Sequence, residues 1–285
     1  MWVPLGSVDQ VLPPSLLAGA PVALPGGGPV LDVAASPPPN PWFSWQYLER
    51  NGPDVLRYLE QHATLTAQAV LLALVVALPL AVLAHLRPRW SAPVLAGTGV
   101  LYTIPSLALF AVLAPYTGIG RTTVLIGLVV YALLVLVRNV LVGLQGVDPA
   151  VRDAARGMGY GRARMLLAVE LPQAVPAVIT GLRLATVSTV ALVTVGVVVG
   201  YGGLGQLMFR GFRSNYHAEI MTATVLCLLL ALVADLLLLL LGRLLTPWQR
   251  GSRRAARAAA DPDSPSGAEA PARRTTTAEE AAWTS

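Results

Sequence analysis

Residues 148–172 read DPAVRDAARGMGYGRARMLLAVELP, and this polar stretch interrupts a chain otherwise built of apolar runs that are too long for soluble helices. Asp148-Pro149 is typical of a helix N-cap followed by proline at the first helical position. Three glycines then predict a turn, because glycine reaches positive φ without steric cost. A second short helix is expected from Arg162 to Glu170, where Leu171-Pro172 should stop it. The stretch therefore predicts a helix, a glycine turn and a helix, at which the protein meets a partner.

The first of these two helices is expected to be amphipathic. Its apolar residues recur at the spacing of one helical face, at Val151, Ala154, Ala155 and Met158. Its opposite face carries three charged residues, Arg152, Asp153 and Arg156. A juxtamembrane helix lying on lipid would show the same pattern, so amphipathicity alone does not identify the partner.

The spacing within this stretch resembles the EAA motif of ABC importer permeases. The residues that carry the resemblance are Asp153, Ala154, Ala155, Gly159, Val169, Leu171 and Pro172, with Asp and Val where the motif usually has Glu and Ile. In that family the loop forms coupling helices that dock into a groove on a cytoplasmic ATPase. The resemblance implies an all-α integral membrane protein with the type I ABC importer transmembrane fold, about five spanning helices and a cytoplasmic coupling-helix loop.

Composition supports a membrane protein independently of the motif. Hydrophobic residues make up 55% of the chain and charged residues 12%, well below the roughly 25% charged residues of soluble domains. The sequence contains no lysine, so a Walker A loop is excluded and ATP hydrolysis must come from a separate protein. The single cysteine, Cys227, excludes an intramolecular disulfide and a cysteine metal cluster. The pI near 9.8 is attributed to arginines at the cytoplasmic face, and no nucleic-acid partner is expected.

The chain divides into three parts by composition. Residues 1–41 are rich in proline and glycine, make a poor signal peptide and are expected to be disordered. Residues 42–248 form the expected transmembrane domain. It begins at 42–59 with a stretch typical of an interfacial helix, which we interpret as an ordinary amphipathic lead-in to the first span. Residues 249–285 are expected to be a disordered cytoplasmic tail. Five segments within the domain reach the length that a bilayer requires: near 64–86, 92–114, 122–144, 174–200 and 219–242.

The orientation follows from placing residues 148–172 in the cytoplasm. Alternation of the five spans then puts the N-terminus outside and the C-terminus inside. Eleven arginines fall in the segments placed inside and five in those placed outside, in agreement with the positive-inside rule. We therefore expect a multi-pass protein of the cell (cytoplasmic) membrane of a bacterium.

Phrases outside the loop resemble one branch of the permeases, the osmoprotectant importers that carry glycine betaine, choline, carnitine or related quaternary amines. These phrases are 101–110, Pro115, 117–120, Arg138-Asn139, 146–149 and 181–186, and the whole resemblance covers about Trp42 to Trp248. It implies a homodimeric or heterodimeric pair of permease subunits, an ABC ATPase docked on each, and an extracytoplasmic solute-binding protein. It also implies that this chain binds no cofactor, and that ATP and magnesium bind to the ATPase.

Polar and aromatic groups inside the apolar spans are candidates for the substrate pathway. They are Tyr102, Thr103, Pro105, Ser106, Arg138, Asn139, Thr186 and Thr189. Pro105 frees a carbonyl one turn earlier, which needs a hydroxyl, a water or a protein cavity. Tyr102, Tyr131 and Tyr201 are able to attract a quaternary ammonium through their ring faces. The small residues Gly181, Ala185 and Thr189 fit helix packing and pathway lining equally well.

A stand-alone secondary transporter or channel is the alternative function, with Arg138 and Asp235 as coupling charges. A membrane-embedded enzyme is a weaker third possibility, because the spans show no recurring catalytic or metal-ligand spacing. Arg138 and Asp235 are expected at similar depth, and we predict that they pair within about 4 Å, with Asn139 completing a polar patch. In the competing arrangement Arg138 reaches the headgroups, and Asp235 bonds a hydroxyl or pairs with Arg243.

Overall fold

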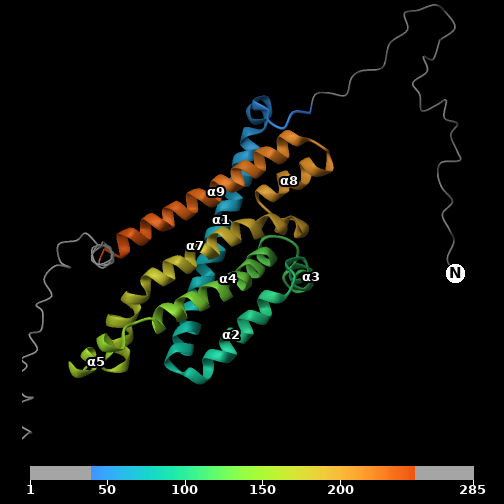
Figure 1. The fold of residues 1–285 in the computed structure, drawn as a ribbon. Helices are drawn as coiled ribbons and strands as arrows, with labels where there is room; N and C mark the ends of the chain where they lie inside the picture. Colours follow the sequence, from blue (N-terminus) through green and yellow to red (C-terminus); the bar gives the residue numbers. More distant parts are fainter. Residues whose placement is uncertain (1–39, 248–285) are drawn as a thin grey trace, which may run out of the picture.

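The computed structural model describes residues 40–247, and regular structure within this range is entirely helical. The helices are α1 (Trp45–Leu86), α2 (Pro88–Thr103), α3 (Ser106–Thr117), α4 (Arg121–Gln145), α5 (Pro149–Gly157), α6 (Arg162–Met165), α7 (Leu171–Val195), α8 (Leu204–Arg213) and α9 (His217–Leu245), as shown in Figure 1. A π-helical turn, Leu166–Glu170, precedes α7, and a 3₁₀ turn, Gly196–Val199, follows it. The all-α prediction is confirmed. The disorder expected at both ends concerns residues that lie almost wholly outside the described range.

Within residues 40–247, four continuous helical stretches are long and apolar enough to cross a membrane, namely Trp45–Leu86, Arg121–Gln145, Arg162–Val199 and His217–Leu245. The pair α2 and α3 makes a fifth crossing if the two bent helices are counted together. This agrees with the expected number of about five spans. α9 is the least covered, with 6% of its most apolar window buried against 50% for α4.

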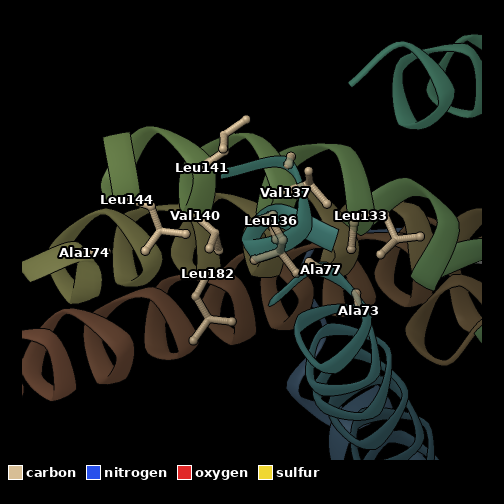
Figure 2. Close-up of a cluster of buried hydrophobic side chains, with 14 of the residues drawn as sticks. Ala73, Ala77, Leu133, Leu136, Val137, Val140, Leu141, Leu144, Ala174 and Leu182 are labelled. Carbon is tan, nitrogen blue, oxygen red and sulfur yellow. The ribbon is translucent and has the colours of Figure 1, made fainter. Parts of the chain in front are cut away.

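α4 lies at the centre of the bundle, between α1 and α7. Its side chains at Leu136, Val140 and Leu144 are fully buried, and Figure 2 shows them gathered with residues of α1 and α7. α1 meets them with a row of buried alanines at four-residue spacing, Ala69, Ala73, Ala77 and Ala81. Small residues at this spacing let membrane helices approach closely. The close α1–α4 contact therefore follows from a repeat that the sequence analysis did not use.

Glycine brings α4 and α7 together in the same way. A Cβ on Gly181 would lie 2.5 Å from the Cβ of Asn139, and one on Gly143 would lie 2.8 Å from the Cβ of Ala177. Such separations are sterically forbidden, so both positions require glycine for this helix crossing. Ala185 and Thr189, the next members of the small-residue row, are buried as well. In the single chain, this row is a packing surface.

The lead-in expected at 42–59 is not separated from the first span. It is the first part of α1, a continuous helix of 42 residues, or about 63 Å. This length is about twice the apolar thickness of a bilayer, so α1 extends beyond it. Tyr47 and Val55 in the extension pack against Leu204 and Leu207 of α8 and against the start of α9. Protein contacts therefore hold the aromatic start of α1.

The expected span at 92–114 is not one straight helix. The chain breaks at Ile104 and Pro105, and α2 and α3 meet at an angle of 94°. The Tyr131 hydroxyl of α4 donates a hydrogen bond to the carbonyl of Ile104. The carbonyl expected to be freed by Pro105 lies one turn earlier in the chain, whereas the hydroxyl contact that the structure shows is to Ile104, because α2 ends before Pro105.

The connection from α7 to α8 is fixed by a buried histidine of α1. His62 Nε2 lies 3.0 Å from the carbonyl of Val190, and the Leu204 amide donates to Nδ1 at 3.2 Å. Since Nδ1 accepts, Nε2 carries the proton and donates to Val190. Gly203, at φ +54°, brings the backbone so close to His62 that a Cβ would lie 2.7 Å from the histidine Cβ. This turn therefore depends on glycine and on a specific histidine tautomer.

The connecting segments collect at two opposite ends of the bundle (Figure 1). At one end, the last turn of α1, the α5 region and the π turn meet through His85, Arg152 and Glu170. At the other end, His217 at the start of α9 donates its amide to Asn40 at 2.9 Å. The 200–204 turn lies at this second end beside Ile119. The arrangement is the one that the alternating spans predict.

Candidate functional site

The outer surface of the 148–172 loop is exposed in the single chain. Asp148 caps α5, accepting the Ala150 amide at 2.8 Å, and Pro149 occupies the first helical position as predicted. Asp153 and Arg156 form an exposed ion pair at 2.9 Å. Met158, which is 69% exposed, and Leu167, which is 65% exposed, add apolar surface to the same loop. Exposed apolar side chains ringed by charges are typical of a protein docking surface.

The predicted sides of α5 need a correction. Of the four apolar residues expected on one face, only Ala155 is buried, and Met158 is among the most exposed side chains of the loop. Arg152, assigned to the outer charged face, instead points inward and donates to the carbonyl of Leu144 at 2.8 Å. The physical reason is that a buried carboxylate lies beneath α5, and arginine is the side chain that reaches it.

Gly159 alone supplies the special backbone conformation of the turn. Its φ is +81°, in the left-handed region that favours glycine, and no neighbouring atom would meet a Cβ there. Gly157 ends α5 and Gly161 has φ −72°, so neither uses the freedom that the sequence suggested. Of the three glycines, the one within the motif is therefore the one that the turn requires.

The second predicted helix, from Arg162 to Glu170, begins as expected but does not stop at Leu171-Pro172. It continues through the π turn into α7 and forms one helical stretch, Arg162–Val199. The amide of Leu171 donates to the carbonyl of Leu166, five residues back, so the widened turn absorbs the proline at the start of α7. The motif residues Val169 and Leu171 are half-buried in this continuation, while Pro172 is exposed.

A buried polar cluster joins the loop to the membrane helices. Glu170 is 6% exposed, and its Oε2 lies 2.9 Å from His85 Nε2 of α1. Its Oε1 lies 3.1 Å from Arg152 Nε of α5. This cluster was not predicted, because the three residues are far apart in the chain. The available signal was an acidic residue directly before the Leu-Pro that begins an apolar span.

The pathway candidates fall into two groups. Tyr102, Thr103, Pro105 and Ser106 lie together at the break between α2 and α3, where Tyr102 is 45% exposed. The rings of Tyr102 and Tyr131 pack edge to face, with their centroids 5.8 Å apart. Tyr201 lies elsewhere, beside the core around Phe110 and Val124. An exposed ring supported by a second ring is a suitable contact for a quaternary ammonium.

The remaining candidates lie within or beside helix contacts. Thr186 and Thr189 are buried in α7, and Thr186 donates to the carbonyl of Leu182 in its own helix. Asn139 donates to Val135 and packs against Gly181. Arg138 is exposed on α4. These four residues do not gather with Tyr102 in the single chain.

The predicted pair of Arg138 and Asp235 is wrong. Asp235 of α9 instead forms a two-pronged ion pair with Arg183 of α7, with Nε and Nη2 each 2.7 Å from a carboxylate oxygen. Arg183 is a second arginine inside an apolar span, and equal depth along the chain does not distinguish it from Arg138 as a partner for Asp235. The two-pronged geometry explains the choice, since both carboxylate oxygens are matched by one guanidinium.

A further polar group at the opposite end of the bundle was also missed. Arg210 of α8 pairs with the buried Glu219 of α9, beside a cavity of about 330 Å³ that Tyr47 and Tyr216 help to line. The two tyrosine rings meet edge to face, with centroids 5.5 Å apart. This cluster fixes α8 against α9 and the start of α1.

Comparison with known proteins gives one family and one fold. Residues 69–251 match the family described as binding-protein-dependent transport system inner membrane component. The chain is 36% identical over 202 residues to the glycine betaine/carnitine/choline transport system permease protein OpuCD of Bacillus subtilis, covering 70% of this chain and 88% of the relative.

Two further similarities agree. The osmoprotectant import permease protein OsmW of Salmonella typhimurium is 37% identical over 193 residues, covering 66% of this chain and 89% of that protein. Among solved structures, a chain of the MetNI methionine ABC transporter superposes with a TM-score of 0.65 at 24% identity, covering 70% of this chain and 99% of that chain.

Proposed function

The chain belongs to the family of binding-protein-dependent transport system inner membrane components, and from this premise we propose that it is the permease subunit of an importer for osmoprotectants of the quaternary ammonium type. The family is one of transport components, embedded as multi-pass proteins in the cell membrane. A permease of this kind works with an ATPase, a solute-binding protein and a second permease subunit.

The observation that carries the mechanism is the exposed outer surface of residues 148–172. Asp153, Ala154 and Gly159 are exposed there, whereas Ala155 faces the protein and lets α5 approach it closely. We assign the motif residues Asp153, Ala154, Ala155, Gly159, Val169, Leu171 and Pro172 to ATPase coupling. In this proposal the loop and the C-terminus are cytoplasmic, and ATP and magnesium bind to the ATPase, since this chain has no lysine for a Walker A loop.

The substrate class rests on the named relatives and on one structural feature. Glycine betaine, carnitine and choline, the solutes in the name of OpuCD, share a quaternary ammonium group, which has no hydrogen-bond donor. The exposed Tyr102 ring, supported by Tyr131, offers a π face to such a cation, worth about 0.5–2 kcal/mol. As pathway residues we prefer the exposed group at the α2–α3 break, Tyr102, Thr103, Pro105 and Ser106. Thr186 and Thr189 are weaker candidates, because they are buried within helix contacts.

The alternative of a stand-alone transporter using Arg138 and Asp235 is not favoured. Asp235 is neutralised by Arg183, and the homologous proteins are permeases of binding-protein-dependent systems. A coupling charge would need to be released during each cycle, whereas a two-pronged pair holds the carboxylate in one place.

The test is reconstitution of this chain with the ATPase and solute-binding protein of its own system in liposomes. We expect ATP-dependent uptake of radiolabelled glycine betaine, choline or carnitine, and copurification of the ATPase with the chain. Uptake driven by an ion gradient without the ATPase would contradict the proposal. Replacing Tyr102 with alanine should reduce uptake, and Tyr102→Phe should retain most of it, because phenylalanine keeps the ring face.

A further inference from the structure

Arg152 makes the main polar contacts between α5 and the rest of the protein. Its Nη2 donates to the carbonyl of Leu144 in the last turn of α4, and its Nε faces Glu170. Arg152 is partly buried, and Ala155 is the one fully buried residue of α5, whose small side chain contributes little contact area. The position of this nine-residue helix against the bundle therefore depends mainly on the side chain of Arg152.

Glu170 connects Arg152 to two membrane helices. It closes the π turn from which α7 continues, and its second oxygen contacts His85 in the last turn of α1. The three side chains thus join α5 with the same ends of α1, α4 and α7. A carboxylate that is 6% exposed would be costly without partners, so the three groups stabilise one another in this arrangement.

We propose that Arg152, Glu170 and His85 form a latch that makes α5 move as one body with the inner ends of α1, α4 and α7. The proposal rests on the proposed function, because it concerns how force from a docked ATPase reaches the pathway. The three are positioning residues: none lies on the exposed docking surface, and each acts by holding the helix that does. The latch is distinct from the motif residues, since Arg152, Glu170 and His85 are not among them.

The first arm of the test measures how firmly α5 packs against the bundle, without solute or ATPase. Hydrogen–deuterium exchange of the α5 amides is followed in the full chain in nanodiscs. Arg152→Gln and Glu170→Gln should each accelerate exchange in α5 at least tenfold, while α8 at the opposite end exchanges at the wild-type rate. Arg57→Gln is the matched control, because Arg57 forms an exposed pair with Asp54 elsewhere on α1 and should leave α5 unchanged.

The second arm measures transported solute per ATP hydrolysed in the reconstituted complex. Both latch variants should lower this ratio at least fivefold, with the ATPase bound at wild-type stoichiometry and the KM for solute unchanged. The double variant should be little worse than either single one, because either change opens the same contact. His85→Gln, which leaves the Arg152 contact in place, should give a smaller loss.

Two results would overturn the latch: wild-type exchange of α5 in both variants, or a transport ratio within twofold of wild type in both. Loss of protection in α8 as well would show that Glu170→Gln disturbs the whole fold, and Arg152→Gln, at the edge of the bundle, then decides. A wild-type complex that imports no quaternary amine would overturn the proposed function alone, because the exchange experiment uses neither solute nor ATPase.

Discussion

His62 shows how much one side chain contributes when both of its nitrogens are used. It is completely buried where α1 meets α7 and the start of α8, and it satisfies one carbonyl and one amide. A buried polar group that loses its partner costs about 1–3 kcal/mol. The histidine therefore determines how these three elements fit together.

We predict that His62→Ala lowers the thermal unfolding midpoint of the detergent-solubilised chain by several degrees, since Val190 and Leu204 both lose their partners. In His62→Gln the amide nitrogen is able to take the place of Nε2 and donate to Val190, but the amide oxygen lies farther along the side chain than Nδ1 and matches Leu204 less well. The loss should therefore be smaller than for alanine. Equal losses for the two variants would show that the space filled by the ring matters and that its hydrogen bonds do not.

Gly159 is the second position where a single residue decides a local structure. Its φ of +81° is unfavourable for every residue with a Cβ, most of all for β-branched ones. We predict that Gly159→Val abolishes uptake while the helical content measured by circular dichroism stays at the wild-type level. Gly161→Ala, at φ −72°, is the control and should retain uptake. Full transport by Gly159→Val would remove the turn from the coupling mechanism.

At the scale of elements, the break between α2 and α3 depends on a neighbouring helix. The Tyr131 hydroxyl satisfies Ile104, and its ring supports Tyr102. We predict that Tyr131→Phe keeps the ring contact but leaves the carbonyl of Ile104 unpaired, which lowers the free energy of unfolding by about 1–3 kcal/mol. Because the break between α2 and α3 is then less well held, uptake should fall severalfold. The measurement is uptake by the variant at equal expression in membranes. A variant with wild-type uptake and wild-type thermal stability would show that water or lipid serves Ile104 equally well.

The crossing of α4 and α7 gives a second prediction for elements. Gly181→Val places a branched side chain where even a Cβ would lie 2.5 Å from Asn139, so the helices must separate. We expect the chain to lose several degrees of thermal stability and to aggregate in detergent during size-exclusion chromatography. Gly97→Ala is the control, because nothing lies within 4 Å of the added carbon. Comparable behaviour of the two variants would refute the close packing.

The elements that could be predicted are those determined by local residues. Apolar length predicted the spans apart from the break between α2 and α3, Asp148-Pro149 predicted the start of α5, and the three glycines predicted the turn that Gly159 makes. The continuation of the second loop helix past Pro172 was not predictable from proline alone, because a π turn removes the conflict. Arg183 and Asp235, or Arg152 and Glu170, meet only after the helices pack, so their pairing depends on tertiary structure. Local patterns therefore predict the motif, whereas the contacts that attach the loop to the membrane helices depend on how those helices pack.

At the scale of the whole molecule, the two ends of the bundle predict two accessible surfaces on opposite sides of the membrane. In a Cys227→Ala background, which has no other cysteine, Ala150→Cys should react with a membrane-impermeant maleimide only in inverted vesicles. Ser214→Cys, exposed after α8, should react in whole spheroplasts. Reaction of both cysteines from the same side would contradict the proposed topology.

The helical stretch from Arg162 to Val199 is continuous, so we expect a tilt at one end to move the other end with it. Its 38 residues span about 57 Å, so a tilt of about 5° about its inner end would displace the far end by about 5 Å. That far end lies against His62 and the glycine turn that leads into α8. A small rotation at the docking loop would thus become a displacement of several ångströms at the opposite end of the bundle. The π turn is the part of this helix that would bend first.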